Sequence, residues 1–198
     1  MGKITNKTDL KFADRSEGIQ LRICGSAYSH LEPGFRAAGS GRFDDPQRRY
    51  ETLYVAPTFS ACYEEALVRD GYDDAVNRYH VFRARHEAAS LSVLLVDFSQ
   101  LRIVDFTGQN LRDMGLNLGD VMAEYPLTQE LSSSLYNHPA QPHGIKYPSR
   151  MSTDAICFVL FDRAKNHVRC MPGLAPAPLT SLGEAFDSFC HGRSIALI

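Results

Sequence analysis

The sequence predicts an α+β fold organised as a single compact domain. Segments typical of strands outnumber segments typical of helices, and the two kinds do not alternate regularly, as they would in a doubly wound α/β sheet. The chain has 198 residues and 44% hydrophobic content, which suffices for one substantial core and does not require a second. We expect one domain over residues 1–198, with a core at about 18–165 and a C-terminal extension, 166–198, packed on it.

The first half of the chain contains two strand patterns and one helix pattern. Ile19–Cys24 is typical of a strand and leads into Gly25–Gly41, a glycine-punctuated stretch with few regular signals. A loop of this length inside a compact domain is usually functional. Thr52–Ala56 predicts a second strand. The Pro-Thr pair at residues 57–58 can terminate this strand and cap the helix that follows. Apolar side chains recur with helical spacing at 59, 62, 63, 66 and 67, and we expect the helix to stop near residues 70–71.

The second half predicts more strands than helices. Strands are expected at Asn77–Arg85, Leu91–Phe98, Leu101–Phe106, Gly144–Tyr147, Ala155–Phe161 and Ser194–Leu197. Helical segments are expected at Asn110–Met114, Leu127–Tyr136 and Leu182–Cys190, the second after a proline and the third ended by a glycine. Prolines at 172, 176 and 178 indicate a stiff connector.

Composition excludes several functional classes. A net charge of −2 and a pI near 6.4 give no large basic surface, so we expect no direct nucleic-acid binding. The five cysteines are scattered without a C-x-x-C pair, which argues for a reducing cytoplasm without structural zinc or disulfides. The first residues lack the apolar core of a signal peptide, and no stretch approaches the roughly 20 apolar residues of a membrane span. We therefore expect a cytoplasmic protein without membrane association.

Familiar catalytic and metal motifs are missing. The sequence has no G-x-G-x-x-G that opens a βαβ unit and no G-x-x-x-x-G-K-[ST], which excludes the usual dinucleotide and P-loop signatures. H-E-x-x-H is absent, and His138 and His143 lie in a proline-rich loop without further ligands at metal spacing, so we expect no metal site. Ser149 lacks the G-x-S-x-G elbow of a hydrolase nucleophile.

The run Gly39-Ser40-Gly41-Arg42-Phe43 and the segments after it hold the best candidates for chemistry. Glycines allow the backbone to approach a ligand closely, and the guanidinium of Arg42 can hold a phosphate with several donors. Tyr54 offers a flat stacking surface, and Glu65 supplies a carboxylate. These parts suit a site that binds a nucleotide and breaks a glycosidic bond.

Together with Leu21-Arg22-Ile23 and the segment 144–150, Gly-Ile-Lys-Tyr-Pro-Ser-Arg, this arrangement resembles the RES domain family, named for its Arg, Glu and Ser. The resemblance covers roughly residues 20–162, in the order and at the spacing of the family. Phe43 stands where tryptophan is commoner, and Ser40 where a second glycine is common. The matching positions are the first arginine Arg22, the glycine-element arginine Arg42, the strand tyrosine Tyr54, the helix glutamate and the late serine Ser149.

Two adjacent glutamates compete for the helix position. At about 100° per residue, Glu64 and Glu65 fall on opposite flanks of the apolar stripe, so helix geometry does not choose between them. The tyrosine-to-glutamate spacing of the family favours Glu65. On this resemblance the catalytic residues are Arg42, Tyr54 and Glu65, and the residues that bind NAD are Arg22, Gly41, Phe43, Tyr147 and Ser149.

The resemblance implies a fold similar to ADP-ribosyltransferases of the diphtheria-toxin type, with a central split β-sheet flanked by helices. It implies a bacterial toxin that depletes NAD as its substrate by phosphorolysis or hydrolysis, with inorganic phosphate as a possible co-substrate and no resident cofactor. The implied partner is an Xre-type antitoxin or an immunity protein. Two alternatives stay open: a mono-ADP-ribosyltransferase that modifies a protein, and a nucleotide-binding module without turnover.

Each candidate residue also has a plain structural explanation. Arg22 fits a solvent-facing strand position, and Tyr54 fits the core of an apolar strand. Glu64 and Glu65 fit ordinary solvated helix positions, and Ser149 fits a turn or a cap. The positions become informative as one ordered set.

Overall fold

The structure is a computed structural model that describes residues 4–14, 18–28, 33–68, 71–73, 78–152 and 154–198. The described strands form three sheets. One contains β2 (Thr52–Val55), β8 (Ile156–Phe161), β7 (Gly144–Pro148) and β6 (Ile103–Asp105), in that order. β8 is antiparallel to β2 and β7, whereas β6 runs parallel to β7.

Helices α3 (Gly108–Asp113), α4 (Leu118–Val121) and α5 (Tyr125–Tyr136) pack beside this sheet. Leu111, Val121 and Leu135 from these helices share one buried cluster with Val104 and Ile145 from the strands. Burial of these apolar side chains supplies the main driving force for the packing. On one side, this cluster borders the residues that form the candidate site.

The second sheet pairs β1 (Gly18–Gly25) with β5 (Ala89–Val96) antiparallel over their whole lengths. Two short strands, β9 (Val168–Cys170) and β10 (Ala177–Pro178), also pair with β5. β1 meets the first sheet through reciprocal backbone hydrogen bonds between Leu21 and Ala56, with N···O distances of 2.8 and 3.0 Å. The two sheets therefore adjoin directly below the helix that follows β2.

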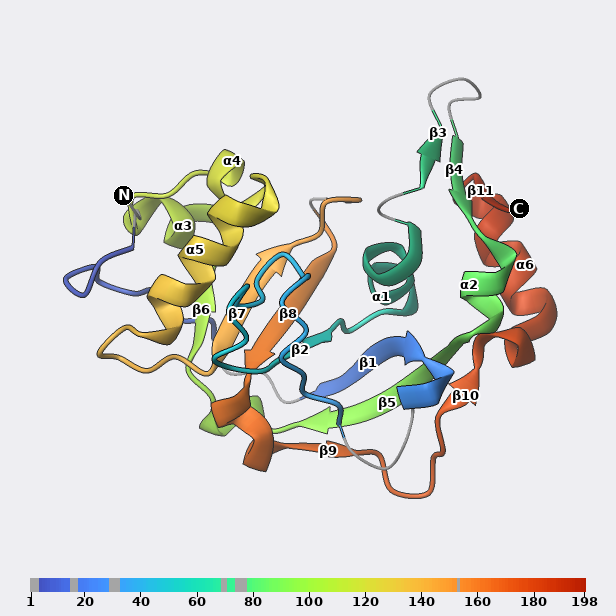
Figure 1. Cartoon of the computed structure of the whole chain (residues 1–198), viewed down its shortest axis with the longest axis horizontal. Helices are drawn as coiled ribbons and strands as arrows, with labels where there is room; N and C mark the ends of the chain where they lie inside the picture. The colour runs from blue at the N-terminus through green and yellow to red at the C-terminus, as the bar shows by residue number, and fades with distance from the viewer. Residues whose placement is uncertain (1–3, 15–17, 29–32, 69–70, 74–77, 153) are drawn as a thin grey trace.

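The third sheet joins β3 (Tyr72–Asp73), β4 (Arg78–Val81) and β11 (Ile195–Leu197), with β11 parallel to β4. Helices α2 (Arg83–Glu87) and α6 (Gly183–Gly192) lie near it, at the end of the molecule opposite α3, α4 and α5 (Figure 1). 3₁₀ helices occupy Ser26–Tyr28, Phe98–Gln100, Asp162–His167 and Leu179–Leu182.

Helix α1 (Phe59–Tyr63) follows β2 and contacts both β1 and β8. Thr58 caps it as expected, since its Oγ1 accepts a hydrogen bond from the backbone N of Ala61 at 3.3 Å. The helix continues as a π-helical turn, Glu64–Val68. Figure 1 shows α1 between the two groups of helices, so this element occupies a central position.

The mixed α+β single-domain architecture is confirmed, with boundaries that differ from the expectations in places. The strand expected at Asn77–Arg85 was wrong beyond Val81: β4 ends there, where its partner β11 ends at Leu197, and α2 follows. Polar-apolar alternation cannot reveal where a distant partner strand stops. The strand expected at Leu101–Phe106 is shorter, and α4 and β9 were not anticipated.

Some expectations fall on undescribed positions. Residues 29–32 of the predicted Gly25–Gly41 loop, residue 70 at the predicted helix end, and residue 77 lie outside the described residues. In the described part of the chain, no helix has the length and apolar character that crossing a membrane requires.

Candidate functional site

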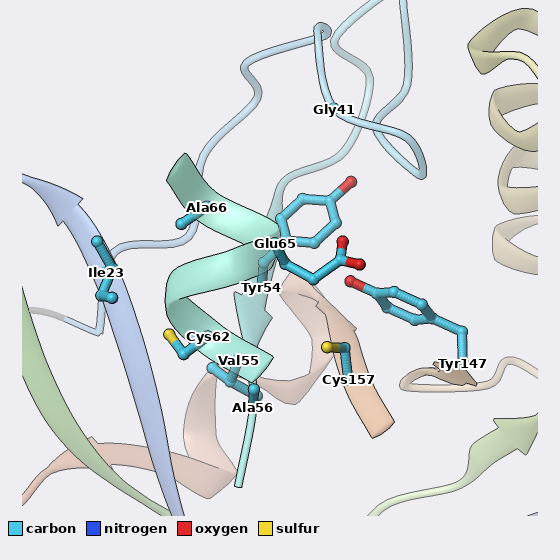
Figure 2. Close-up of a pocket in the computed structure, with 10 residues that line it drawn as sticks. All are labelled: Ile23, Gly41, Tyr54, Val55, Ala56, Cys62, Glu65, Ala66, Tyr147 and Cys157. Carbon is cyan, nitrogen blue, oxygen red and sulfur yellow. The ribbon is translucent and has the colours of Figure 1, made fainter. Parts of the chain in front are cut away.

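A cavity of about 240 Å³ lies where β1, β2, α1, β7 and β8 converge. Figure 2 shows the side chains of Tyr54, Glu65 and Tyr147 converging on it, with Gly41 above them. Its lining is Ile23, Gly41, Tyr54, Val55, Ala56, Cys62, Glu65, Ala66, Tyr147 and Cys157. The structure therefore brings four of the sequence-predicted site residues, Gly41, Tyr54, Glu65 and Tyr147, to a single cavity.

The Glu65 carboxylate is held by the segment that follows β7. Its Oε1 accepts a hydrogen bond of 2.6 Å from Ser149 Oγ and one of 2.8 Å from the backbone N of Arg150. Ser149 Oγ itself accepts from the backbone N of Met151 at 3.0 Å, which leaves its proton for Glu65. Two donors on one oxygen fix the orientation of the carboxylate. We call Glu65, Ser149 and Arg150 the carboxylate wall.

The adjacent Glu64 points elsewhere. Its Oε1 lies 2.7 Å from Arg193 Nη1, and its side chain is buried rather than solvated. Both glutamates belong to the π-helical turn, whose i→i+5 pattern changes the angular spacing on which the helix argument depended. Of the two candidates left open by helix geometry, the structure places Glu65 at the cavity.

The glycine loop, Gly39–Asp44, forms the opposite wall and is organised by Asp44. The Oδ2 atom of Asp44 accepts hydrogen bonds from the backbone N of Ser40 (3.2 Å) and Gly41 (2.7 Å). Its Oδ1 accepts from Thr52 Oγ1 (2.6 Å) and Tyr54 Oη (3.0 Å). Asp44 was not among the predicted residues. The acidic pair directly after the glycine element was the only sequence signal for it.

Tyr54 uses its hydroxyl within the protein. Besides donating to Asp44, its Oη accepts a hydrogen bond of 2.8 Å from the backbone N of Phe43. Burial, reinforced by the nearby Asp44 carboxylate, raises the pKa of the Tyr54 phenol well above its usual value. The ring of Tyr54 lines the cavity, and its hydroxyl stabilises the glycine loop through these two hydrogen bonds.

Gly41 is required for this packing. A Cβ at Gly41 would lie 2.7 Å from Tyr54 Oη and 3.0 Å from Asp44 Cγ, closer than side chains tolerate. From the helix side, Gln129 Nε2 donates to Gly41 O at 2.9 Å and Ser132 Oγ donates to Phe43 O at 2.7 Å. The missing side chain at Gly41 thus leaves room for Tyr54 and Asp44, and Gly41 also lines the cavity.

Arg42 is 1% exposed and does not line the cavity. Its guanidinium carbon lies 4.5 Å from the ring centroid of Tyr147 and 4.8 Å from that of Phe43. Nη2 donates to Pro148 O at 3.3 Å, whereas the buried Nε has no hydrogen-bond partner among the residues that the structure describes. Phe43 is completely buried and packs on Tyr147 with ring centroids 4.8 Å apart. Arg42 and Phe43 therefore support Tyr147 from behind.

Arg22 is buried in a neighbouring cavity of about 200 Å³, which shares Ile23 and Tyr54 with the first. A Cβ at Gly34, whose φ is +85°, would lie 2.4 Å from the Arg22 guanidinium, so only glycine leaves room there. Arg36 also lines this cavity and stacks on Tyr28, 3.6 Å from the ring centroid. Burial, with a smaller contribution from Arg36, lowers the pKa of Arg22. Arg22 is not the solvent-facing cation of the plain explanation.

Two thiols, those of Cys62 and Cys157, line the first cavity. Burial raises the pKa of the Cys62 thiol to about 12 and also raises that of Cys157, so both stay protonated at neutral pH. Burial likewise raises the pKa of the Tyr147 phenol. Among the described side chains, no group of three or more His, Cys, Asp or Glu is arranged to hold a metal ion.

Comparisons with known proteins identify a family and a similar fold. The family model described as RES domain matches residues 20–180. A solved structure, the toxin–antitoxin complex MbcT–MbcA of M. tuberculosis, contains a chain similar in fold, with a TM-score of 0.61 and 17% sequence identity. The match covers 85% of this chain and 90% of that one. No protein of curated function matches the sequence.

Proposed function

The chain belongs to the RES domain family, and from this premise we propose that it is an enzyme that consumes NAD and acts as the toxin of a toxin–antitoxin pair. The observation that carries the enzymatic part is the Glu65 carboxylate, oriented by Ser149 Oγ and the Arg150 backbone N beside a cavity lined by Tyr54 and Tyr147. A carboxylate fixed in this way can stabilise positive charge that develops on a bound ribose.

The chemistry suits cleavage of the nicotinamide–ribose bond. As that bond breaks, its electron pair leaves with the nicotinamide nitrogen, and positive charge spreads over the ribose as in glycoside hydrolysis. Glu65 stabilises this charge, and a phosphate oxygen, or a water that releases a proton to the solvent, then adds to the ribose carbon. In our proposal Ser149 keeps Glu65 in place, while Tyr54 and Tyr147 provide the aromatic walls for the nicotinamide ribose.

We assign the phosphate groups of NAD to the side of Arg22. The first cavity is too small for a whole dinucleotide, and the second cavity begins at the shared residues Ile23 and Tyr54. An NAD molecule that crosses Tyr54 would bring its pyrophosphate toward Arg22, a donor suited to phosphate oxygens. Arg42, in its present contact with Tyr147, would reach a phosphate only after its guanidinium turned outward.

Product analysis tests the proposal directly. Purified protein is incubated with NAD, with and without inorganic phosphate, and the products are separated. A phosphorylated ADP-ribose that appears only with phosphate identifies phosphorolysis, and free ADP-ribose identifies hydrolysis. Label from NAD that accumulates on one protein in a cell extract would instead identify an ADP-ribosyltransferase. Undiminished NAD under all three conditions would refute the enzymatic proposal.

A matched pair of variants locates the chemistry. Glu65→Gln should lower kcat by about a hundredfold or more, since it removes the charge at the cavity while retaining the shape. Glu130→Gln is the control, because it makes the same chemical change at an exposed position of α5 that does not line the cavity. Equal losses in the two variants would contradict the role proposed for Glu65.

The partner is proposed on the fold alone. The similar chain of M. tuberculosis was solved as a toxin–antitoxin complex, and we propose an antitoxin, of the Xre type, for this chain as well. Expression of the wild type should arrest bacterial growth, and the folded Glu65→Gln variant should not. Arrest by that variant would separate toxicity from NAD cleavage.

A further inference from the structure

Glu64 is the buried neighbour of the candidate catalytic carboxylate. Its side chain is 6% exposed and pairs with Arg193, which is half-exposed. Burial raises the pKa of the Glu64 carboxyl, and the nearby Arg193 opposes this shift. A carboxylate in such a place is costly unless a cation pairs with it, because it has lost most of its hydration.

Arg193 belongs to the C-terminal part of the chain. It caps the end of α6, and Phe186 and Phe189 of that helix pack against Tyr63, with ring centroids 5.1 and 5.5 Å apart. Tyr63 is the last residue of α1 before the π-helical turn. The C-terminal helix thus contacts the turn through an aromatic cluster and through one ion pair.

The turn is held from two sides by consecutive residues. Arg193 holds Glu64 on one side, while Ser149 and the backbone of Arg150 hold Glu65 on the other. Because the two glutamates share one peptide unit, a rotation that carries Glu64 toward water also displaces Glu65 from Ser149. Displacement of a catalytic group by about 1 Å can reduce a rate a hundredfold.

We propose that Arg193 is a positioning residue: through its ion pair with Glu64 it sets the rotation of the π-helical turn and keeps the Glu65 carboxylate on Ser149 and Arg150. Arg193 touches no substrate in this scheme. The effect of Arg193 on kcat rests on the proposed function, whereas its effect on the position of the Glu65 carboxylate does not.

The kinetic experiment compares Arg193→Gln with Arg78→Gln. Arg78 is a matched control, because its Nε contacts the carbonyl of Ser194 in the same part of the molecule, at 3.4 Å, without contacting Glu64. Arg193→Gln should lower kcat for NAD cleavage by at least about tenfold and leave KM within about twofold. Arg78→Gln should leave both unchanged. Equal kcat values for Arg193→Gln and the wild type would overturn the proposal.

Two further variants separate positioning from general destabilisation. Arg193→Lys retains a cation and should recover much of the lost kcat. The double variant Glu64→Gln/Arg193→Gln should also exceed Arg193→Gln in kcat, because a neutral amide at 64 no longer needs a cation. A double variant no better than the single one would overturn the role of the ion pair.

An activity-free measurement keeps the proposal testable if the wild type leaves NAD intact. The backbone amide of Arg150 donates to Glu65 Oε1, so its hydrogen exchange reports the position of that carboxylate. Arg193→Gln should speed this exchange by at least about tenfold, and the double variant should restore protection. The amide of Phe161, which donates to His143 O at 2.8 Å, serves as the reference and should not change. Unchanged protection of Arg150 would overturn the proposal.

Discussion

The two walls of the cavity use their polar groups differently. In the glycine loop, both carboxylate oxygens of Asp44 accept hydrogen bonds from backbone and side-chain donors of the protein. The Tyr54 hydroxyl bonds to both Phe43 and Asp44. In the carboxylate wall, Ser149 and the Arg150 backbone converge on one oxygen of Glu65 beside the cavity. The first wall is therefore a scaffold, and the second presents the carboxylate that we propose to be catalytic. Substitutions in the two should differ in whether they affect stability or turnover.

Asp44→Ala should produce the largest effect. It leaves buried N–H and O–H donors without their acceptor, and we expect a loss of about 3 kcal/mol in the free energy of unfolding. Denaturant unfolding measures it. Asp97→Ala is the control, because Asp97 accepts similar local bonds from Ser99 at an exposed site. A loss below about 0.5 kcal/mol at Asp44 would contradict its role as the organiser of the loop.

Gly41→Ala should destabilise the protein by about 2 kcal/mol, since the new Cβ would overlap Tyr54 Oη. Tyr54→Phe removes that oxygen and should cost about 1 kcal/mol by itself, through its lost hydrogen bonds. The double variant should cost less than the sum of the two single changes. If thermal or denaturant unfolding shows that the two losses in stability simply add, the strain at Gly41→Ala does not come from contact with Tyr54 Oη.

Ser149→Ala tests the carboxylate wall. Loss of the 2.6 Å bond should free Glu65 to reorient and lower kcat about tenfold, which corresponds to about 1.4 kcal/mol in the barrier. The unfolding free energy should fall by about 1 kcal/mol or less. Kinetics and unfolding of the same preparation give both numbers, with Ser134→Ala on α5 as the control. If Ser149→Ala strongly lowers the unfolding free energy but leaves kcat unchanged, the carboxylate wall also serves as a scaffold.

Asp45→Asn should have the smallest effect, one that depends on pH. Hydrogen bonds from the Arg49 side chain, aided by backbone amides, lower the pKa of Asp45 against the effect of burial. A lowered folded-state pKa gives stability that is present above the unfolded pKa of about 3.9 and is lost as pH falls through the folded pKa. Because Arg49 is half-exposed, we expect about 1 kcal/mol at pH 7.

Unfolding curves of wild type and Asp45→Asn should therefore converge between about pH 4 and pH 2. A difference that stays constant over this range would show that the carboxylate charge does not contribute.

Local patterns predicted the elements that depend on neighbouring residues. The apolar spacing after Thr52–Val55 and the Thr58 cap located α1, because a helix start is determined by side chains within one turn. The strand at Arg78–Val81 shows the limit of this reasoning. It pairs with β11, more than a hundred residues later, and α2 follows it directly, and alternation within the strand encodes neither feature.

The arginines show the same limit within the site. Arg42 follows a glycine element, a local context that favours a phosphate ligand. One of its hydrogen bonds goes to Pro148 O, 106 residues away, and its guanidinium lies on the Tyr147 ring. Arg22 and Tyr54 in turn belong to adjoining cavities that share a wall. Which groups an arginine meets is a property of the packed chain, since no local pattern specifies distant partners.

The sequence by itself indicated the α+β class, the family, and four of the residues that line the cavity, Gly41, Tyr54, Glu65 and Tyr147, because composition, periodicity and ordered motifs are carried by the chain. The spacing of the family already favoured Glu65 over Glu64, but only the tertiary structure shows which of the two lies at the cavity. A π-helical turn and Arg193, 129 residues from Glu64, direct one glutamate to an ion pair, while Ser149 and Arg150 hold the other at the cavity. Adjacent and chemically identical side chains are distinguished only by the partners that folding brings to them.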